Sequence, residues 1–188
     1  MATVVYRACR RTDLIEGVWS FFNYGLANYR GSNVNATFTQ NGYNTHGIAT
    51  TADPVVAFMY ACMQADGGHD IAVFAICVED EVARAGSVKL QAISNGVARN
   101  TACWQSVDAQ NEVVLPSVKR SDILGFYSVR TRSGFYDLGD WTDVEGDTQL
   151  KKLTRNLIKS SVTDFARRYG GLVSQQIHQK EIDRMMGH

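Results

Sequence analysis

The sequence predicts one domain of the mixed α+β (α/β) class. Short apolar runs of strand length recur between residues 3 and 130, whereas residues 148–169 carry apolar side chains at helical spacing. The chain has 188 residues, 45% of them hydrophobic, with 19 basic and 19 acidic side chains. This composition is typical of a globular domain and argues against a disordered chain or a uniformly basic nucleic-acid-binding protein.

The first quarter of the chain is expected to contain one strand, one short helix and a long loop. Residues 3–7 are rich in β-formers and predict the first strand, and residues 13–22 predict a short helix capped by Thr12 or Asp13. Residues 23–45 are rich in Asn, Gly, Ser and Thr and lack apolar periodicity, so we expect a loop there. Loops of this length in compact domains often cover or form binding surfaces.

A strand, a helix and a buried strand are expected next. Residues 46–51 are a short strand candidate, and Asp53 and Pro54 then begin a helix with proline at its first position. Two consecutive glycines end this helix. The continuous apolar run 71–78 follows and predicts a central strand covered on both faces.

Three more strands and two more helices complete the prediction. The strand candidates are residues 88–93, 112–115 and 123–130. Residues 148–169 predict an amphipathic helix. Its expected apolar face consists of Leu150, Leu153, Leu157, Ile158, Val162 and Phe165. Two glycines break it, and residues 172–186 predict a second, shorter helix.

The zero net charge conceals a division along the chain. Residues 1–148 hold 11 basic and 16 acidic side chains, whereas residues 149–188 hold 8 and 3. We therefore expect an acidic body, residues 1–148, and a basic helical C-terminal extension, residues 149–188, packed on it. A solvated helix face is the simplest role for these bases, with an anionic partner or nucleic acid as the alternative.

Several classes of protein are disfavoured by what the sequence lacks. It contains no apolar run near the roughly 18 residues of a membrane span and no N-terminal basic segment leading into an apolar one, so we expect neither membrane insertion nor a signal peptide. The four cysteines never form a CxxC pair, so we expect no metal site. Phosphate-loop, HExxH and GxSxG motifs do not occur.

Chemistry is suggested instead by the order of three segments. Arg7 lies inside the first strand, Thr50 and Thr51 lie on a strand that leads into a helix, and Glu112 opens a later strand two residues after Gln110. An arginine can bind a phosphate, hydroxyls can orient a carboxylate, and a well-placed carboxylate can stabilise a ribosyl oxocarbenium ion. Together these residue types suit glycosidic cleavage of a dinucleotide. Singly, each also suits an ordinary structural role.

In this order of segments the chain resembles the mono-ADP-ribosyltransferase toxins. The resemblance is to the branch with an Arg, Ser-Thr-Ser, Glu signature, which includes the catalytic domains of cholera toxin, heat-labile enterotoxin, pertussis toxin and pierisin. It covers roughly residues 3–130 and is carried by Tyr6-Arg7, Ala49-Thr50-Thr51, Gln110-Asn111-Glu112 and residues 121–129. The resemblance implies a split antiparallel β-sheet around an NAD cleft.

The same resemblance implies roles for individual residues. Arg7 would hold NAD through its phosphates, and Glu112 would bind the nicotinamide ribose and stabilise the oxocarbenium-like transition state. Thr50 and Thr51 would shape the cofactor site and orient Glu112. Ala49 stands where the family has a serine that bonds the glutamate, so either threonine substitutes for it or turnover is reduced.

Acceptor recognition would fall to residues shortly before the glutamate. Gln110 would face the acceptor, and glutamine there favours an acceptor other than arginine. Trp104 lies on a predicted loop, where it either docks a macromolecular partner or belongs to the core. Residues 24–46 correspond to a mobile loop over the NAD cleft of the enterotoxin relatives. We interpret Tyr60 as helix packing.

The sequence therefore predicts a mono-ADP-ribosyltransferase that uses NAD as co-substrate and no metal. The expected acceptor is a macromolecule, with a host protein favoured over nucleic acid. Alternatives are a NAD glycohydrolase, a DNA-base ADP-ribosyltransferase and a catalytically decayed binding module. The resemblance also implies a secreted or injected toxin or effector that acts in the cytoplasm of a target cell.

Overall fold

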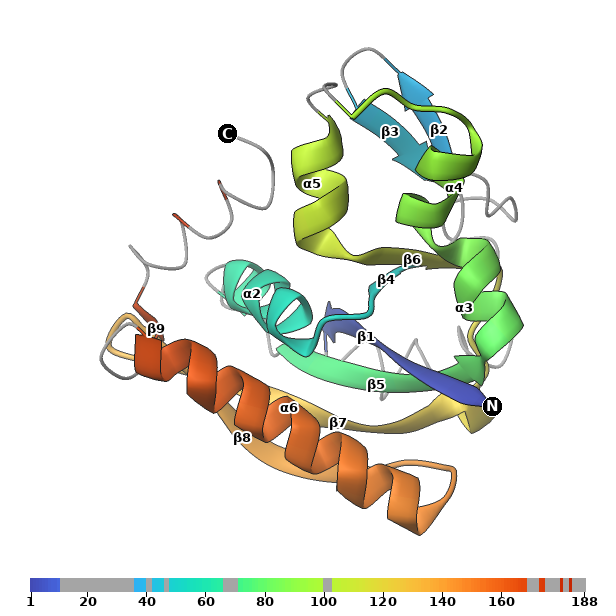
Figure 1. Cartoon of the computed structure of the whole chain (residues 1–188). Coiled ribbons are helices and arrows are strands. Elements are labelled where there is room, and N and C mark those ends of the chain that lie inside the picture. Colours follow the sequence, from blue (N-terminus) through green and yellow to red (C-terminus); the bar gives the residue numbers. More distant parts are fainter. Residues whose placement is uncertain are drawn as a thin grey trace.

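The protein is an antiparallel sheet flanked by helices, as Figure 1 shows. The computed structural model describes residues 1–10, 36–39, 42–45, 48–65, 71–99, 103–168 and 173–174, together with Lys180 and Asp183. Its main sheet has seven strands in the order β6-β4-β1-β5-β7-β8-β9, and β2 and β3 form a separate hairpin. This mixed architecture confirms the α+β class.

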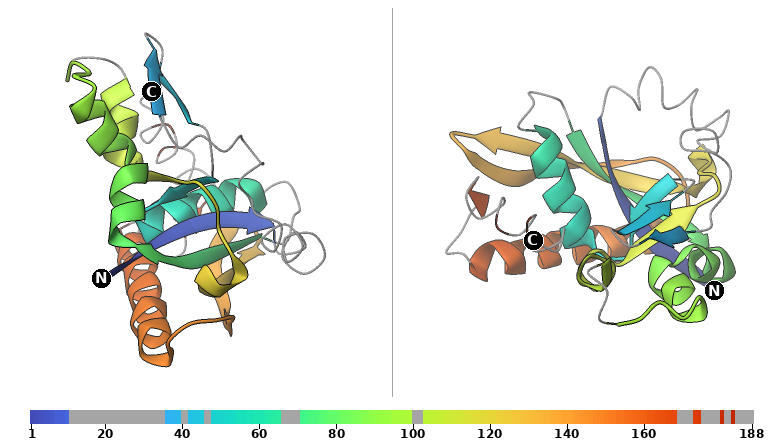
Figure 2. Two further views of the ribbon diagram at one scale, coloured as in Figure 1. Left: turned by 90° about the vertical axis from the view of Figure 1, so that its right-hand side faces the viewer. Right: turned by 90° about the horizontal axis from the view of Figure 1, so that it is seen from above.

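Two long strands form the centre of the sheet. β1 (Ala2–Arg10) and β5 (Ile71–Glu79) are antiparallel and paired over nine residues. Figure 2 shows these two strands, in blue and green, beside each other. The first six residues of β5 are buried, because their side chains alternate between two core clusters on the two faces of the sheet. The continuous apolar run of this segment therefore correctly predicted a central strand.

A long hairpin extends the sheet on one side. β7 (Ile123–Arg132) pairs with β5 and with β8 (Phe135–Asp143), and the two-residue strand β9 (Val173–Ser174) follows. Ser133 and Gly134 join β7 to β8 with φ angles of 50° and 80°. Positive φ at both central residues is the geometry that matches the twist of a tight hairpin.

The other side of the sheet is shorter. β4 (Ile48–Thr51) pairs with β6 (Glu112–Leu115) over four residues, but with β1 only between Tyr6 and Thr51. The edge formed by β4 and β6 thus joins the central strands at a single residue pair. Whether this junction corresponds to the split sheet of the ADP-ribosyltransferases stays a prediction.

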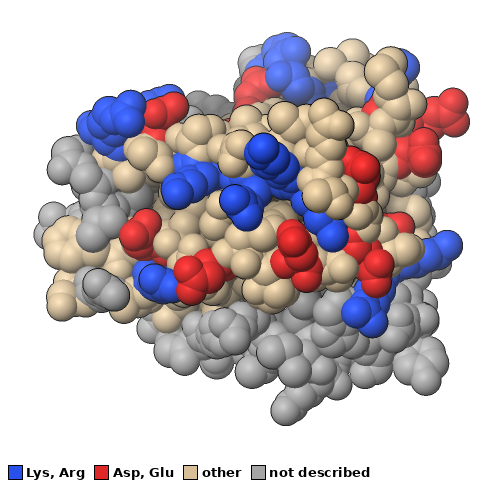
Figure 3. All heavy atoms as spheres, turned by 90° about the horizontal axis from the view of Figure 1, so that it is seen from below, with Lys and Arg blue, Asp and Glu red and all other residues tan. Residues whose placement is uncertain are grey.

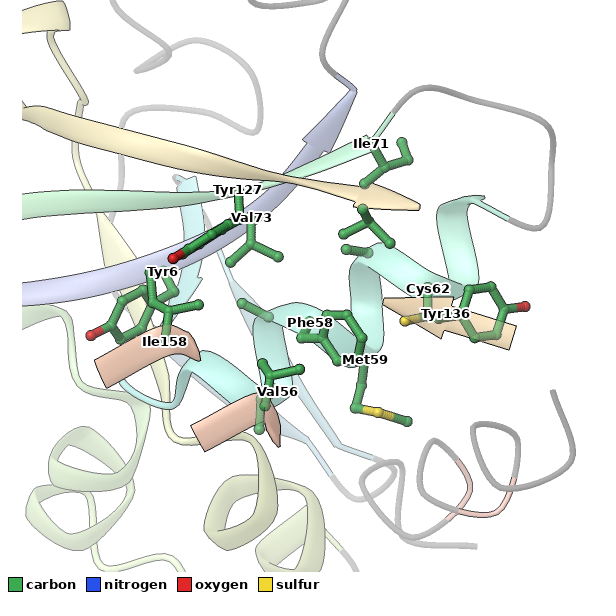
Figure 4. Packing of buried hydrophobic residues seen from close by; sticks show 14 of the residues in the cluster. Tyr6, Val56, Phe58, Met59, Cys62, Ile71, Val73, Tyr127, Tyr136 and Ile158 are labelled. Carbon is green, nitrogen blue, oxygen red and sulfur yellow. The ribbon is translucent and has the colours of Figure 1, made fainter. Parts of the chain in front are cut away.

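The main core lies between the sheet and two helices, α2 (Pro54–Ala65) and α6 (Thr148–Arg168). The Asp53 carboxylate accepts a hydrogen bond from the Val55 N–H at 2.8 Å, which caps α2 next to its initial proline. Figure 4 shows side chains of α2, the sheet and α6 meeting in this core, which includes Tyr6, Val56, Phe58, Met59, Tyr127, Tyr136 and Ile158.

The apolar face of α6 is narrower than its sequence indicates. Ile158, Val162 and Phe165 are buried, but Leu153 and Leu157 are 61% and 52% exposed. Among the described residues, α6 contacts α2, β7 and β8, and these two leucines lie outside the stripe of buried residues.

A second group of helices covers β6. The segments are α3 (Asp80–Gly86), α4 (Val88–Ser94) and α5 (Cys103–Gln110). Two expectations were wrong here: residues 88–93 form α4 instead of a strand, and the segment that contains Trp104 is a helix instead of a loop. The Ser87 hydroxyl accepts a hydrogen bond from the Leu90 N–H at 3.3 Å and so caps the start of α4. The prediction of a strand rested on the spacing of apolar residues, which does not take this N-cap into account.

Two other expectations changed in part. Within the predicted loop 23–45, β2 (Ala36–Thr39) and β3 (Gly42–Thr45) form a hairpin. The remaining residues of that loop, and the predicted helix 13–22, lie outside the described residues. Within the predicted helix 172–186, β9 is a strand, Lys180 and Asp183 are helical, and the other residues lie outside the description.

The acidic body and the basic helix share one face. On α6, Lys152, Arg155 and Lys159 are exposed, and the neighbouring β8 exposes Asp137 and Asp140. Figure 3 shows blue and red side chains interspersed over the face seen from below. The charges that are separated along the sequence are therefore mixed on this surface. Within the described part of the chain, none of the helices is long and apolar enough to cross a membrane.

Candidate active site

The short strand β4 holds the backbone on both sides of Glu112. In the β4–β6 ladder Thr51 is paired with Glu112 and Thr50 with Val113. The buried Thr51 hydroxyl donates to the Gln110 carbonyl, and the buried Thr50 hydroxyl donates to the Val113 carbonyl, each at 2.6 Å. The two threonines therefore fix the carbonyl groups that precede and follow the glutamate.

A tight turn delivers Glu112 to the start of β6. Asn111 has a φ of 45°, a conformation that asparagine tolerates better than most residues. Its carbonyl accepts a hydrogen bond from the Ala52 N–H at 3.0 Å. The Thr51 hydroxyl also accepts a bond from the Asp53 N–H at 3.1 Å, so this turn is tied to the beginning of α2. Glu112 itself is half-buried.

Tyr60 is a member of this site that the sequence analysis assigned to packing. Its hydroxyl donates to Gln110 Oε1 at 3.1 Å. Burial, and secondly the negative charge of Glu112, raise the pKa of the Tyr60 phenol above its ordinary value. The phenol is therefore neutral at physiological pH and lies close enough to Glu112 to be influenced by its charge. The sequence gives no signal for this contact, because it joins helices α2 and α5 through space.

Arg7 lies on β1, the neighbour of β4 on the side away from β6, and its side chain is hydrogen-bonded to β4. Its Nη1 donates to the Ala49 carbonyl, and its Nε contacts Cys9 Sγ at 3.1 Å. Side chains alternate along a strand, so Arg7 projects from the face opposite to Tyr6. Tyr6, Thr51 and Glu112 are successive cross-strand partners and share one face. The link between Arg7 and the Glu112 region therefore runs through β4.

The predicted site residues fall into two groups. Arg7, Ala49, Thr50, Thr51 and Glu112 meet at β4, and Gln110 joins them from the end of α5. Gln110 is only 9% exposed and bonded to Tyr60, which does not suit direct contact with a large acceptor.

Trp104 lies apart from this group and belongs to a small core. It is 4% exposed, packs with Val88, Val107 and Val114, and donates from Nε1 to the Val97 carbonyl at 3.2 Å. The Arg99 guanidinium covers its ring at 3.9 Å. Because docking requires an exposed ring, the docking interpretation of Trp104 is wrong and the core alternative is correct.

Tyr6 provides a test of the electrostatics beside the site. Burial, and secondly the negative charge of Asp53, raise the pKa of Tyr6 from 10.0 to about 12. A phenol with a raised pKa stabilises the folded state fully below pH 10, and this contribution is lost as the pH rises from 10 towards 12. We expect the free energy of unfolding to decline more steeply over this range in the wild type than in Tyr6→Phe, as measured by urea denaturation. Equal slopes would contradict the shifted pKa.

The candidate site has the residue types for binding an anion and for stabilising a positive charge. A guanidinium and the backbone that carries a half-buried glutamate are both hydrogen-bonded to one short strand. Within the described residues, no group of three His, Cys, Asp or Glu side chains is arranged to hold a metal ion. Compared with models of known protein families and with curated proteins, the chain has no match. Membership of the ADP-ribosyltransferase family therefore stays a prediction.

Proposed function

We propose that the protein is a mono-ADP-ribosyltransferase that cleaves NAD and transfers ADP-ribose to a macromolecule. The observation that carries the proposal is the attachment of both Arg7 and the Glu112 turn to β4. One short strand thereby holds both groups, with the Arg7 side chain on the opposite face of the sheet from Glu112, so an NAD molecule that contacts both must cross the sheet at its β4–β6 edge. The resemblance of the three segments to the toxin family supports the same activity.

Glu112 has the central chemical role in this proposal. Its carboxylate binds the ribose next to nicotinamide and stabilises the positive charge that develops at C1′. The bond between C1′ and the nicotinamide nitrogen breaks, and its electron pair leaves with nicotinamide. A nucleophilic atom of the acceptor then bonds to C1′ and releases its proton. A carboxylate fixed in advance needs little reorganisation during this step.

Arg7 binds the pyrophosphate in this proposal. Its guanidinium is a positively charged group with several N–H donors, and one terminal nitrogen is held by the Ala49 carbonyl. Such a fixed guanidinium suits a phosphate, because charge-assisted hydrogen bonds are strong and directional. Ala49 contributes its backbone carbonyl here, a role that does not depend on the missing serine hydroxyl.

Ala49 stands where the toxin family has a serine that bonds the glutamate, and in this proposal hydrogen bonds to the backbone take over the role of that serine. Thr50 and Thr51 fix the carbonyls before and after Glu112, so the orientation of the glutamate is set by the strand that carries it. This arrangement supports an active enzyme over a decayed binding module. We propose a protein acceptor in a target cell, modified at a side chain other than arginine, and accordingly a role as a toxin or effector.

A second candidate function is NAD hydrolysis, with water as the acceptor. The observation that favours it is the burial of Gln110, whose side chain is engaged by Tyr60 instead of being presented to a partner. The same Glu112 chemistry would serve both reactions. Only the fate of the ADP-ribose distinguishes them.

The two functions can be separated with NAD labelled in its adenosine half. The wild-type chain is incubated with this NAD and a eukaryotic cell lysate, and both free nicotinamide and the position of the label are followed. Label in protein supports the proposed transferase, label in nucleic acid supports a nucleobase acceptor, and label only in free ADP-ribose supports the hydrolase. Stabilisation against heat by NAD without nicotinamide release would indicate a binding module and contradict both enzymes.

A further inference from the structure

We infer that Tyr60 is a positioning residue for Glu112, acting through Gln110. The inference rests on the proposed function and assigns to α2 a part in catalysis. Tyr60 lies on α2, Gln110 is the last residue of α5, and Glu112 opens β6. Three elements thus meet within two residues of the glutamate.

Gln110 is held at both of its ends. Its side-chain Oε1 accepts from the Tyr60 hydroxyl at 3.1 Å, and its main-chain carbonyl accepts from the Thr51 hydroxyl at 2.6 Å. At 9% exposure, the glutamine has little access to water that could replace either bond. Tyr60 and Thr51 therefore fix the residue from which the Asn111 turn departs.

The protonation state of Tyr60 also agrees with a positioning role beside Glu112. Burial and the Glu112 charge keep the phenol protonated, so it remains a hydrogen-bond donor over the physiological pH range. A neutral donor beside a carboxylate does not compete with it for a substrate cation. The hydroxyl can therefore hold the turn without weakening the charge that Glu112 offers to the transition state.

Loss of the hydrogen bond between Tyr60 and Gln110 is expected to affect the rate of nicotinamide release more than the free energy of unfolding. A single neutral hydrogen bond contributes about 0.5–1.5 kcal/mol to folding, whereas a displacement of about 1 Å at a reacting group can cost about a hundredfold in rate. Removing the hydroxyl leaves the tyrosine ring packed on the main core but deletes the hydrogen bond that Gln110 Oε1 accepts. Glu112 would then keep its place in β6, and the turn that precedes it would lose one of its constraints while the bonds from Thr51 and Ala52 remain.

The test compares Tyr60→Phe with Tyr127→Phe. Tyr127 is a matched control, because it also packs in the main core and donates to a backbone carbonyl, that of Arg155, at 3.4 Å. We expect Tyr60→Phe to lower kcat for nicotinamide release by about tenfold with a KM for NAD within about twofold of the wild type. Tyr127→Phe is expected to retain the wild-type kcat.

Gln110→Met tests the same link from its other end and covers the case in which Tyr60→Phe does not fold. It is expected to lower kcat by a similar factor. In the double variant the two losses should not multiply, because either substitution alone already breaks the hydrogen bond between Tyr60 and Gln110. A merely structural role would leave kcat of the folded variants unchanged and would not give this non-additivity.

The activity of the wild type and the role of Tyr60 can be tested separately. If the wild type releases no nicotinamide, the proposed function and this inference both fall. If the wild type is active and Tyr60→Phe matches Tyr127→Phe in kcat, only the role of Tyr60 is overturned. Multiplicative losses in the double variant would likewise show that Tyr60 does not act through Gln110.

Discussion

Glu112→Gln is expected to slow nicotinamide release by about a hundredfold to a thousandfold, comparable to the loss of one preorganised charge-stabilising group. Glutamine keeps the length and shape of the side chain and leaves the Thr50 and Thr51 bonds to the neighbouring carbonyls in place. It removes the negative charge that stabilises the ribosyl cation. The loss should therefore fall on kcat, measured by chromatography of nicotinamide at saturating NAD.

Glu145→Gln is the matched control for this substitution. Glu145 is an exposed glutamate that contacts Arg120 at 3.6 Å, far along the chain from the candidate site. Its replacement is expected to leave kcat unchanged and to change the free energy of unfolding by no more than about 0.5 kcal/mol, as is usual for changes away from buried networks. A Glu112→Gln enzyme that retains a third or more of the wild-type kcat would contradict the role given to the carboxylate.

Gly86→Ala is expected to give the largest loss of stability, about 2–3 kcal/mol, which is the upper range for overpacking in a closely packed site. A Cβ at this position would collide with the Val114 carbonyl oxygen and lie 3.0 Å from its carbonyl carbon. Both contacts are with backbone, so no side-chain rotation can relieve them. α3 must move away from β6, the strand that begins at Glu112. We therefore also expect reduced nicotinamide release in the folded fraction.

Gly96→Ala separates this collision from the general effect of replacing glycine. Gly96 has a φ of 65°, and no heavy atom lies within 4 Å of a Cβ built there. The expected cost is about 1–2 kcal/mol, from left-handed backbone alone. Urea denaturation monitored by circular dichroism measures both variants. Equal losses at the two positions would show that α3 and β6 are not in close backbone contact.

Local patterns were sufficient to predict the elements that carry most of the core. The apolar run of β5 and the helical spacing in α2 and α6 identify those segments, because burial on one or two faces leaves a periodic trace in the sequence. Residues 88–93 show where such a trace is ambiguous. Val88 and Ala92 are buried four residues apart on α4, while Leu90 and Ile93 are exposed, and this short run does not reveal its period.

The candidate site was accessible to sequence analysis only in part. Arg7, the two threonines and Glu112 could be singled out because they lie in short motifs whose order resembles a known family. The contact between Tyr60 and Gln110 joins residues separated by 50 positions, and the burial of Trp104 depends on the packing of α4 and α5 against β6. Such relations are determined by tertiary structure and leave no local pattern.

The rate of nicotinamide release from NAD by the folded wild-type chain tests the central claim most directly. The attachment of Arg7 and the Glu112 turn to β4 predicts a rate that rises in proportion to protein concentration and clearly exceeds spontaneous hydrolysis. The rate should fall by about a hundredfold to a thousandfold in Glu112→Gln. A wild-type protein that unfolds cooperatively, and is therefore intact, yet releases nicotinamide no faster than buffer would contradict the account.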